Sequence, residues 1–179
     1  MRFQIPTWQE VDLDAFLSYW AARYEDPREE LYTENIGRPL TPERIRALFK
    51  WKNGGPLAAK KRESIERNFI ARIPEAEELP EDVPAQEFLQ RFPKGGPIWR
   101  IFWMHCCFPD RFPIFDQHVH RAAARIGGWE EREIPLADKQ RLRAYLEDYL
   151  PFWKSLDRNE RDTDRALWTF GKFLKASGW

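Results

Sequence analysis

The sequence predicts a single domain built almost entirely of α-helices, and three observations support this. Apolar residues recur at spacings of three and four along most of the chain, which is the helical period. Only three valines occur, and no long segment alternates apolar with polar residues as a half-buried strand does. Hydrophobic residues make up 42% of the chain, enough for a packed interior, and 179 residues suit one core.

Signals for helix starts and stops divide the first part of the chain. The first predicted helix has one apolar face and ends before the Asp26–Pro27 pair. Its apolar positions are Leu13, Phe16, Leu17, Trp20 and Tyr24. Residues 28–40 are expected to form a loop. Thr41 as N-cap and Pro42 in the first turn then open a second helix, which Asn-Gly-Gly-Pro terminates.

The middle of the chain is predicted to contain a helix, a connection and a core element. Spacing of apolar residues predicts one helix through residues 65–73. The acidic, proline-bearing segment 74–84 is interpreted as a surface connection, followed by a short helix over residues 85–91. Residues 98–108 are nearly all apolar or aromatic, which predicts a helix buried on every side.

The last third is again helical. Asp116 stands before a helix that Gly127 and Gly128 end, so the sequence predicts an N-cap at one end and a glycine stop at the other. Apolar residues at spacings of three and four predict a helix over residues 142–153. The final helix is expected to run from Asp164 through Phe173.

The charge balance limits the ways in which this chain can bind nucleic acid. Lys plus Arg and Asp plus Glu both number 29, so there is no overall basic field to attract DNA. Binding would need a local patch, and the basic segment 44–67, with Lys60 and Lys61, is the best one in the sequence.

The compartment is expected to be the cytoplasm. The opening MRFQIPTWQEV lacks the apolar core of a signal peptide, and no stretch approaches the roughly 18 apolar residues of a membrane helix. The cysteines, Cys106 and Cys107, are adjacent and unsuited to an ordinary disulfide framework. We also expect a monomer.

Residues 92–127 contain two short motifs on either side of an apolar helix. The first is Phe-Pro-Lys-Gly-Gly, at residues 92–96. The second comprises Asp116, His118, Val119 and Arg121, followed by Arg125, Ile126 and Gly127. They resemble the helix-hairpin-helix DNA glycosylase superfamily, with its endonuclease III-like and 8-oxoguanine glycosylase-like fold. In that superfamily a Leu-Pro-Gly-x-Gly hairpin opens one helix and a Val-Asp-x-His-Val-x-Arg segment opens the next.

The resemblance covers roughly residues 41–175, and residues 1–40 would add an N-terminal helix and loop to one domain spanning residues 1–179. Leu146–Pro151 and Asp164–Leu174 are similar to the closing helices of the superfamily, the second ending at Gly171. The resemblance implies an all-α helix-hairpin-helix bundle that binds double-stranded DNA and removes a damaged or modified base.

The residues in these motifs have a chemistry suited to that reaction. A Gly-Gly-Pro turn at a helix start exposes unpaired N–H groups that can hold a phosphate, so Lys94, Gly95 and Gly96 are candidates for DNA binding. Asp116 is the candidate catalytic residue, because a carboxylate stabilises the positive charge that develops on the sugar and can activate water. Trp99 and Trp103, one turn apart, are candidates for the pocket that receives the base.

Some residues depart from the superfamily pattern. Lys94 replaces the first glycine of the hairpin, and Ile98 falls where bifunctional members carry a Schiff-base lysine. The cysteine cluster of some members is absent from the sequence, so no iron–sulfur cofactor, and no other cofactor, is expected. The resemblance therefore implies monofunctional hydrolysis of the N-glycosidic bond.

Other interpretations remain open. Asp116 is also suited to act only as an N-cap, the two tryptophans to act as core, and the hairpin to be a tight turn. The chain would then be a non-catalytic DNA-binding module of the same fold. A weaker alternative is a metal-dependent hydrolase, with ligands drawn from His105, Cys106, Cys107, Asp116, His118 and His120. The spacing argues against metal, because His118 and His120 do not converge on one helix face. If Asp116 is catalytic, Asp116→Asn is expected to abolish base release and leave the melting temperature nearly unaltered.

Overall fold

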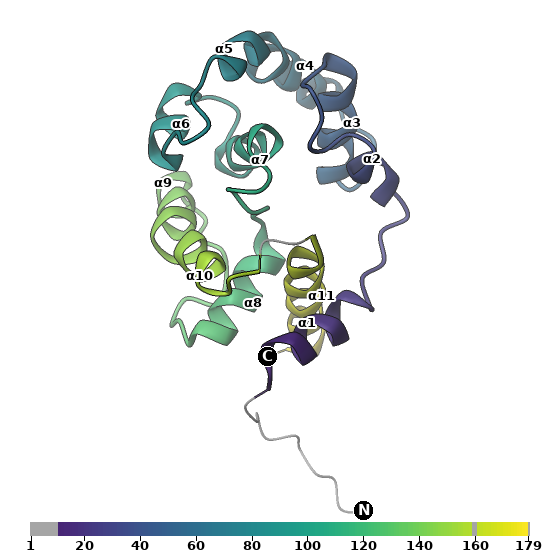
Figure 1. Cartoon of the computed structure of the whole chain (residues 1–179), viewed down its shortest axis with the longest axis vertical. Coiled ribbons are helices and arrows are strands. Elements are labelled where there is room, and N and C mark those ends of the chain that lie inside the picture. Colours follow the sequence, from purple (N-terminus) through teal and green to yellow (C-terminus); the bar gives the residue numbers. More distant parts are fainter. Residues whose placement is uncertain (1–10, 159–160, 179) are drawn as a thin grey trace, which may run out of the picture.

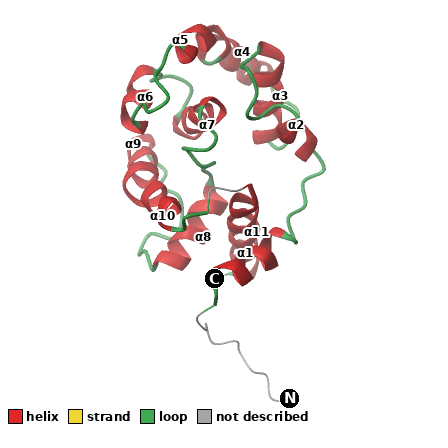
Figure 2. Cartoon of the chain, viewed as in Figure 1, coloured by secondary structure: helices red, strands yellow, loops and turns green. Residues whose placement is uncertain are grey.

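The computed structural model describes residues 11–158 and 161–178, and over these residues every regular element is a helix (Figure 2), which confirms the all-α class. The helices are α1 (Leu13–Ala21), α2 (Glu29–Thr33), α3 (Pro42–Lys52), α4 (Ala59–Asn68), α5 (Ile73–Glu77), α6 (Ala85–Arg91), α7 (Pro97–Cys107), α8 (Gln117–Gly127), α9 (Asp138–Arg143), α10 (Leu150–Ser155) and α11 (Arg161–Ser177). A 3₁₀ turn, Ile70–Arg72, precedes α5, and a π-helical turn, Ala144–Tyr149, joins α9 to α10. In the described part of the chain, no helix combines the length and apolar character required to cross a bilayer.

Helix α7 lies inside a curve of helices formed by α2–α6, α9 and α10, while α1, α8 and α11 pack together at one end of it (Figure 1). Phe102 and Trp103 on α7 are fully buried, and their rings pack against Phe49 of α3 and Phe69 after α4. The prediction of a core helix is confirmed, but burial on every side is wrong for the first turn. Residues 98–100 are only half-buried there, and the first two, Ile98 and Trp99, line an open groove.

Helix α11 packs along α8 and α1, and a glycine permits its close approach to α8. A Cβ atom on Gly171 would lie 1.9 Å from the carbonyl oxygen of His118, so only glycine fits at this crossing. The final helix was expected from Asp164 through Phe173, and α11 runs further in both directions, from Arg161 to Ser177, so Gly171 lies inside it and not at the stop that the resemblance implied. The glycine is required by packing rather than by a helix stop.

Two further predictions need correction. Residues 28–40 contain a short helix, α2, which forms because Tyr32 is buried against the core. The single helix predicted through residues 65–73 is interrupted after Asn68, and Pro74 then occupies the first turn of α5, where its missing N–H carries no cost. The spacing of apolar residues is continuous from α4 into α5, so the sequence pattern did not reveal the break between them.

Candidate active site and nucleic-acid interface

Asp116 lies at the N-terminus of α8, as the sequence predicted. Its Oδ1 accepts hydrogen bonds from the backbone N–H groups of His118, at 2.8 Å, and Val119, at 3.2 Å. The chain leading to it is anchored, since residues 112–115 are all buried. The carboxylate is thus held on a fixed segment, and 22% of its side chain remains exposed.

The second oxygen of Asp116 contacts a lysine from another helix. Lys52, the last residue of α3, places its Nζ 3.1 Å from Oδ2, and its side chain is only 6% exposed. Burial alone would raise the pKa of Asp116. The Lys52 ammonium, the His118 ring and the hydrogen bonds to the carboxylate outweigh burial and hold that pKa below its usual range. Asp116 is therefore ionised at neutral pH.

A cavity of about 120 Å³ opens beside this ion pair. Its lining residues are Tyr24, Asp26, Arg28, Trp51, Lys52, Gly54, Ile114, Asp116, Val119, Arg161, Asp164 and Trp168. One wall comes from residues before position 55 and the other from residues after position 113, so Asp116 faces the N-terminal half of the chain across this cavity. The cavity brings together aromatic rings, the three carboxylates of Asp26, Asp116 and Asp164, and the three cations of Arg28, Lys52 and Arg161.

The first turn of α11 contributes Arg161 and Asp164 to the cavity. Asp164 is only 7% exposed, and its Oδ2 lies 3.6 Å from the NH1 atom of Arg161. Its Oδ1 is buried and has no hydrogen-bond partner among the described residues. Burial raises the pKa of Asp164 to about 6, although the nearby cations Arg161 and Lys52 act in the opposite direction. The same two residues also border a second hollow of about 280 Å³, near Tyr32 and His105.

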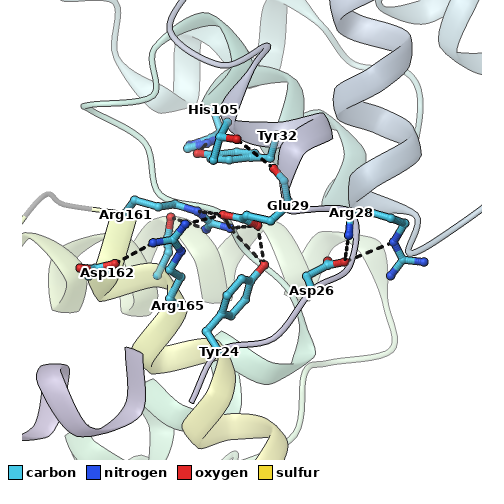
Figure 3. Close-up of polar contacts among 11 residues, drawn as sticks. Tyr24, Asp26, Arg28, Glu29, Tyr32, His105, Arg161, Asp162 and Arg165 are labelled. Carbon is cyan, nitrogen blue, oxygen red and sulfur yellow. Dashed lines mark hydrogen bonds and ion pairs between the residues drawn. The ribbon is translucent and has the colours of Figure 1, made fainter. Parts of the chain in front are cut away.

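Glu29 connects α2 to the start of α11 and fixes the position of Arg161. Its carboxylate accepts hydrogen bonds from the hydroxyl of Tyr24 at 2.8 Å, Nε of Arg161 at 3.1 Å and NH2 of Arg165 at 3.0 Å (Figure 3). The guanidinium of Arg161 also lies 4.3 Å from the centre of the Tyr32 ring. These contacts hold one wall of the cavity against the other.

The Gly95–Gly96 hairpin lies between α6 and α7 at the surface, as predicted. Gly95 has φ +107° and Gly96 has φ +80°, and Gly96 is the N-cap of α7. Both glycines border a groove of about 380 Å³ that Lys60, Lys61 and Trp99 also line. Lys94 is exposed next to the hairpin. Four of the five sequence-predicted DNA-binding residues, all except Lys94, thus line one groove, as does Ile98.

The two tryptophans of α7 have different surroundings. Trp103 is fully buried among Phe69 and Phe92, so it offers no face to a ligand, which corrects its assignment to a base pocket. Trp99 lines the hairpin groove, with the Nζ of Lys61 5.7 Å from the centre of its ring. Neither residue is among those that line the Asp116 cavity. Its aromatic walls come from Tyr24, Trp51 and Trp168, which sequence reasoning missed.

One hydrogen bond links a residue of the groove to the end of α3, next to a residue of the cavity. Nζ of Lys61 donates a hydrogen bond of 2.6 Å to Oδ1 of Asn53, and Asn53 directly follows Lys52. Gly54 lines the cavity from the same turn.

The histidines and cysteines proposed as metal ligands are engaged elsewhere or dispersed. His105 is buried, with Nε2 2.8 Å from the Tyr32 hydroxyl and Nδ1 2.6 Å from the carbonyl oxygen of Phe112. Burial lowers the pKa of His105 to about 3, so it is neutral. Over residues 11–158 and 161–178, no three His, Cys, Asp or Glu side chains gather as a possible ligand set.

Comparisons with known proteins add no family to these observations: no family model, curated protein or solved structure matches the chain. The likeness of residues 92–127 to DNA glycosylases thus remains a resemblance carried by those residues.

Proposed function

We propose that this protein binds double-stranded DNA and hydrolyses the N-glycosidic bond of a damaged or modified base, with Asp116 as the catalytic residue. One observation carries the proposal. An ionised carboxylate, held by backbone N–H groups at a helix start, borders a cavity with aromatic walls. The carboxylate of Asp116 is largely withdrawn from solvent yet lines an opening, and ionisable groups so placed are candidates for chemistry.

The reaction assigned to Asp116 is a single displacement by water. The bond between C1′ of the sugar and the base nitrogen breaks, and the departing base takes up a proton from solvent. The water oxygen bonds to C1′, and the Asp116 carboxylate accepts the proton that this water loses. The same negative charge stabilises the cationic sugar as the old bond breaks. Lys52 holds Oδ2 in place, so it is a positioning residue in this scheme.

The hairpin groove supports the DNA part of the proposal. Lys60, Lys61 and the exposed Lys94 supply local positive charge to a chain of zero net charge. The N–H groups in the first turn of α7 have no partner within their own helix and suit a phosphate oxygen. Phosphate contacts of this kind position the duplex without reading its sequence.

A non-catalytic DNA-binding module of the same fold is the second candidate, and one observation favours it. Both oxygens of Asp116 already have partners in the folded chain: two backbone N–H groups and Lys52. A carboxylate so engaged also serves as a helix cap and ion-pair partner, a role that needs no chemistry. The two candidates share the groove and differ in what Asp116 does.

Base release from duplex oligonucleotides distinguishes the candidates. Duplexes carrying single damaged or modified bases are incubated with the protein, and abasic sites are revealed by alkaline cleavage. A monofunctional hydrolase leaves alkali-labile sites, does not cut the strand itself and forms no adduct that borohydride traps. Duplex binding without any alkali-labile site supports the binding module. A trapped adduct that Lys52→Arg abolishes would contradict hydrolysis by water and assign the chemistry to Lys52.

A further inference from the structure

The cavity beside Asp116 presents an unused hydrogen-bond acceptor. Oδ1 of Asp164 is buried and has no partner in the described part of the chain. A buried polar atom without a partner costs free energy, so such atoms are rare in folded proteins unless a ligand or water completes them. Asp164 lines the cavity and is influenced by the charge of Lys52 on the other wall and by that of Asp116 on its own wall.

An unused donor lies next to this acceptor. Nε and NH2 of Arg161 donate to Glu29, whereas NH1 makes only the 3.6 Å ion pair with Asp164 and no hydrogen bond within the described residues. The position of the guanidinium is fixed by Glu29 and by the Tyr32 ring. The pair therefore offers a ligand one donor beside one acceptor, at fixed positions.

The size of the cavity restricts the ligand. An apolar cavity of about 150 Å³ accommodates benzene. The present cavity, at about 120 Å³ and open on one side, therefore suits a single six-membered ring better than a fused bicyclic one. Tyr24, Trp51 and Trp168 line it, and flat rings stack on such side chains.

We propose that Arg161 and Asp164 read the edge of a monocyclic base of the pyrimidine class, which presents a hydrogen-bond donor beside an acceptor. NH1 of Arg161 donates to the ring nitrogen or carbonyl oxygen, and Oδ1 of Asp164 accepts from the neighbouring amino group or ring N–H. Cytosine and uracil both satisfy this pattern, in opposite orientations of the ring. The inference rests on the proposed function, because it places the reacting base in this cavity.

Binding of free bases to the full chain tests the pair directly, by titration calorimetry or ligand-observed NMR. Cytosine and uracil are compared with 2-pyrimidinone, each methylated at N1 to block the nitrogen that carries the sugar in DNA; 2-pyrimidinone then keeps the ring and the acceptor but lacks the amino donor. Adenine carries the same amino edge on a larger ring. Losing a hydrogen bond to a charged group is expected to weaken binding about tenfold or more, so 2-pyrimidinone should bind less tightly than cytosine by that factor. Adenine should bind less tightly than cytosine because it exceeds the cavity.

Variants at position 164 separate recognition from folding. Asp164→Ala removes the acceptor and should erase the preference for cytosine over 2-pyrimidinone, whereas Asp164→Asn keeps an oxygen and should retain part of it. Asp162→Ala is the matched control, since Asp162 is exposed on the same helix and pairs with Arg165. That control should keep the full preference.

Three results would overturn the inference: equal binding of cytosine and 2-pyrimidinone, tighter binding of adenine, or no detectable binding of any base. Its failure is distinguishable from failure of the proposed function. Base release with no preference among free bases leaves Asp116 as the catalyst and removes Arg161 and Asp164 as readers. A preference that Asp164→Ala erases, without base release from any duplex, supports the readers and removes the hydrolase.

Discussion

The ammonium of Lys52 lies 3.1 Å from the carboxylate of Asp116 and joins the end of α3 to the start of α8. Both side chains are largely withdrawn from solvent, Lys52 at 6% and Asp116 at 22% exposure. Removing either charge therefore leaves the other without its partner. We therefore no longer expect Asp116→Asn to leave the melting temperature unaltered. The variant should melt at a lower temperature, because Lys52 would lose its counter-charge.

Lys52→Met should destabilise the fold, because Asp116 would then be a poorly solvated charge without a partner. Breaking such a pair is expected to lower the free energy of unfolding by about 3 kcal/mol. Urea unfolding monitored by circular dichroism measures this. Lys50→Met makes the same substitution at an exposed position of the same helix and should change the stability by less than about 0.5 kcal/mol. Equal stabilities of the two variants would show that the Lys52–Asp116 pair does not support the fold.

The local sequence predicted Asp116 well but not its partner. An Asp before a helix is a short-range pattern, and its role as N-cap is confirmed. Lys52, Arg161 and Asp164 reach the same cavity from distant helices, and no spacing along the chain encodes that meeting. Likewise, Trp99 and Trp103 are alike in sequence, and only packing against the rest of the core separates the groove residue from the buried one.

Gly95→Ala should cost more stability than Gly96→Ala. Both glycines have positive φ, which costs other residues about 1–2 kcal/mol. A Cβ on Gly95 would also lie 2.3 Å from Cζ of Phe69, a fully buried ring that has little room to move, whereas a Cβ on Gly96 meets nothing within 4 Å. We expect a loss of about 2–5 kcal/mol for Gly95→Ala and about 1–2 kcal/mol for Gly96→Ala. Similar unfolding midpoints for both variants would contradict the close contact with Phe69.

Lys94→Glu and Lys60→Glu should each weaken binding to duplex DNA irrespective of its sequence. The lost interaction is electrostatic, so we expect about a tenfold loss at low salt that shrinks as salt rises. Lys154→Glu changes net charge equally at an exposed site on α10, outside the groove, and serves as the control. Fluorescence anisotropy over a range of salt concentrations measures all three. A loss of equal size in the control would show that overall charge, not the groove, governs binding.

Asp164→Asn should stabilise the protein at alkaline pH but not at acidic pH. Burial raises the folded-state pKa of Asp164 from 3.8 to about 6. The protonated carboxyl group therefore contributes its full stability to the native state below pH 3.8, and this contribution is lost as the pH rises through about 6. At pH 8 the wild type contains a buried, ionised carboxylate that the variant lacks. The variant should then be more stable by about 3 kcal/mol, and the difference should vanish near pH 4. Thermal unfolding across this range measures it, and a difference independent of pH would contradict a raised pKa.

Base release by Asp116→Asn, measured alone and together with Lys52→Gln, tests the central claim most directly. The double variant replaces both charges with neutral amides and should recover the stability that Asp116→Asn loses, as melting temperatures will report. Rates are compared at a temperature where all the proteins are folded, on the duplex from which the wild type releases a base. The account predicts a loss of about 100-fold or more in both variants, because the carboxylate that stabilises the sugar cation is gone. Wild-type rates in the double variant, or no base release by the wild type from any duplex, would contradict it and leave Asp116 as a helix cap.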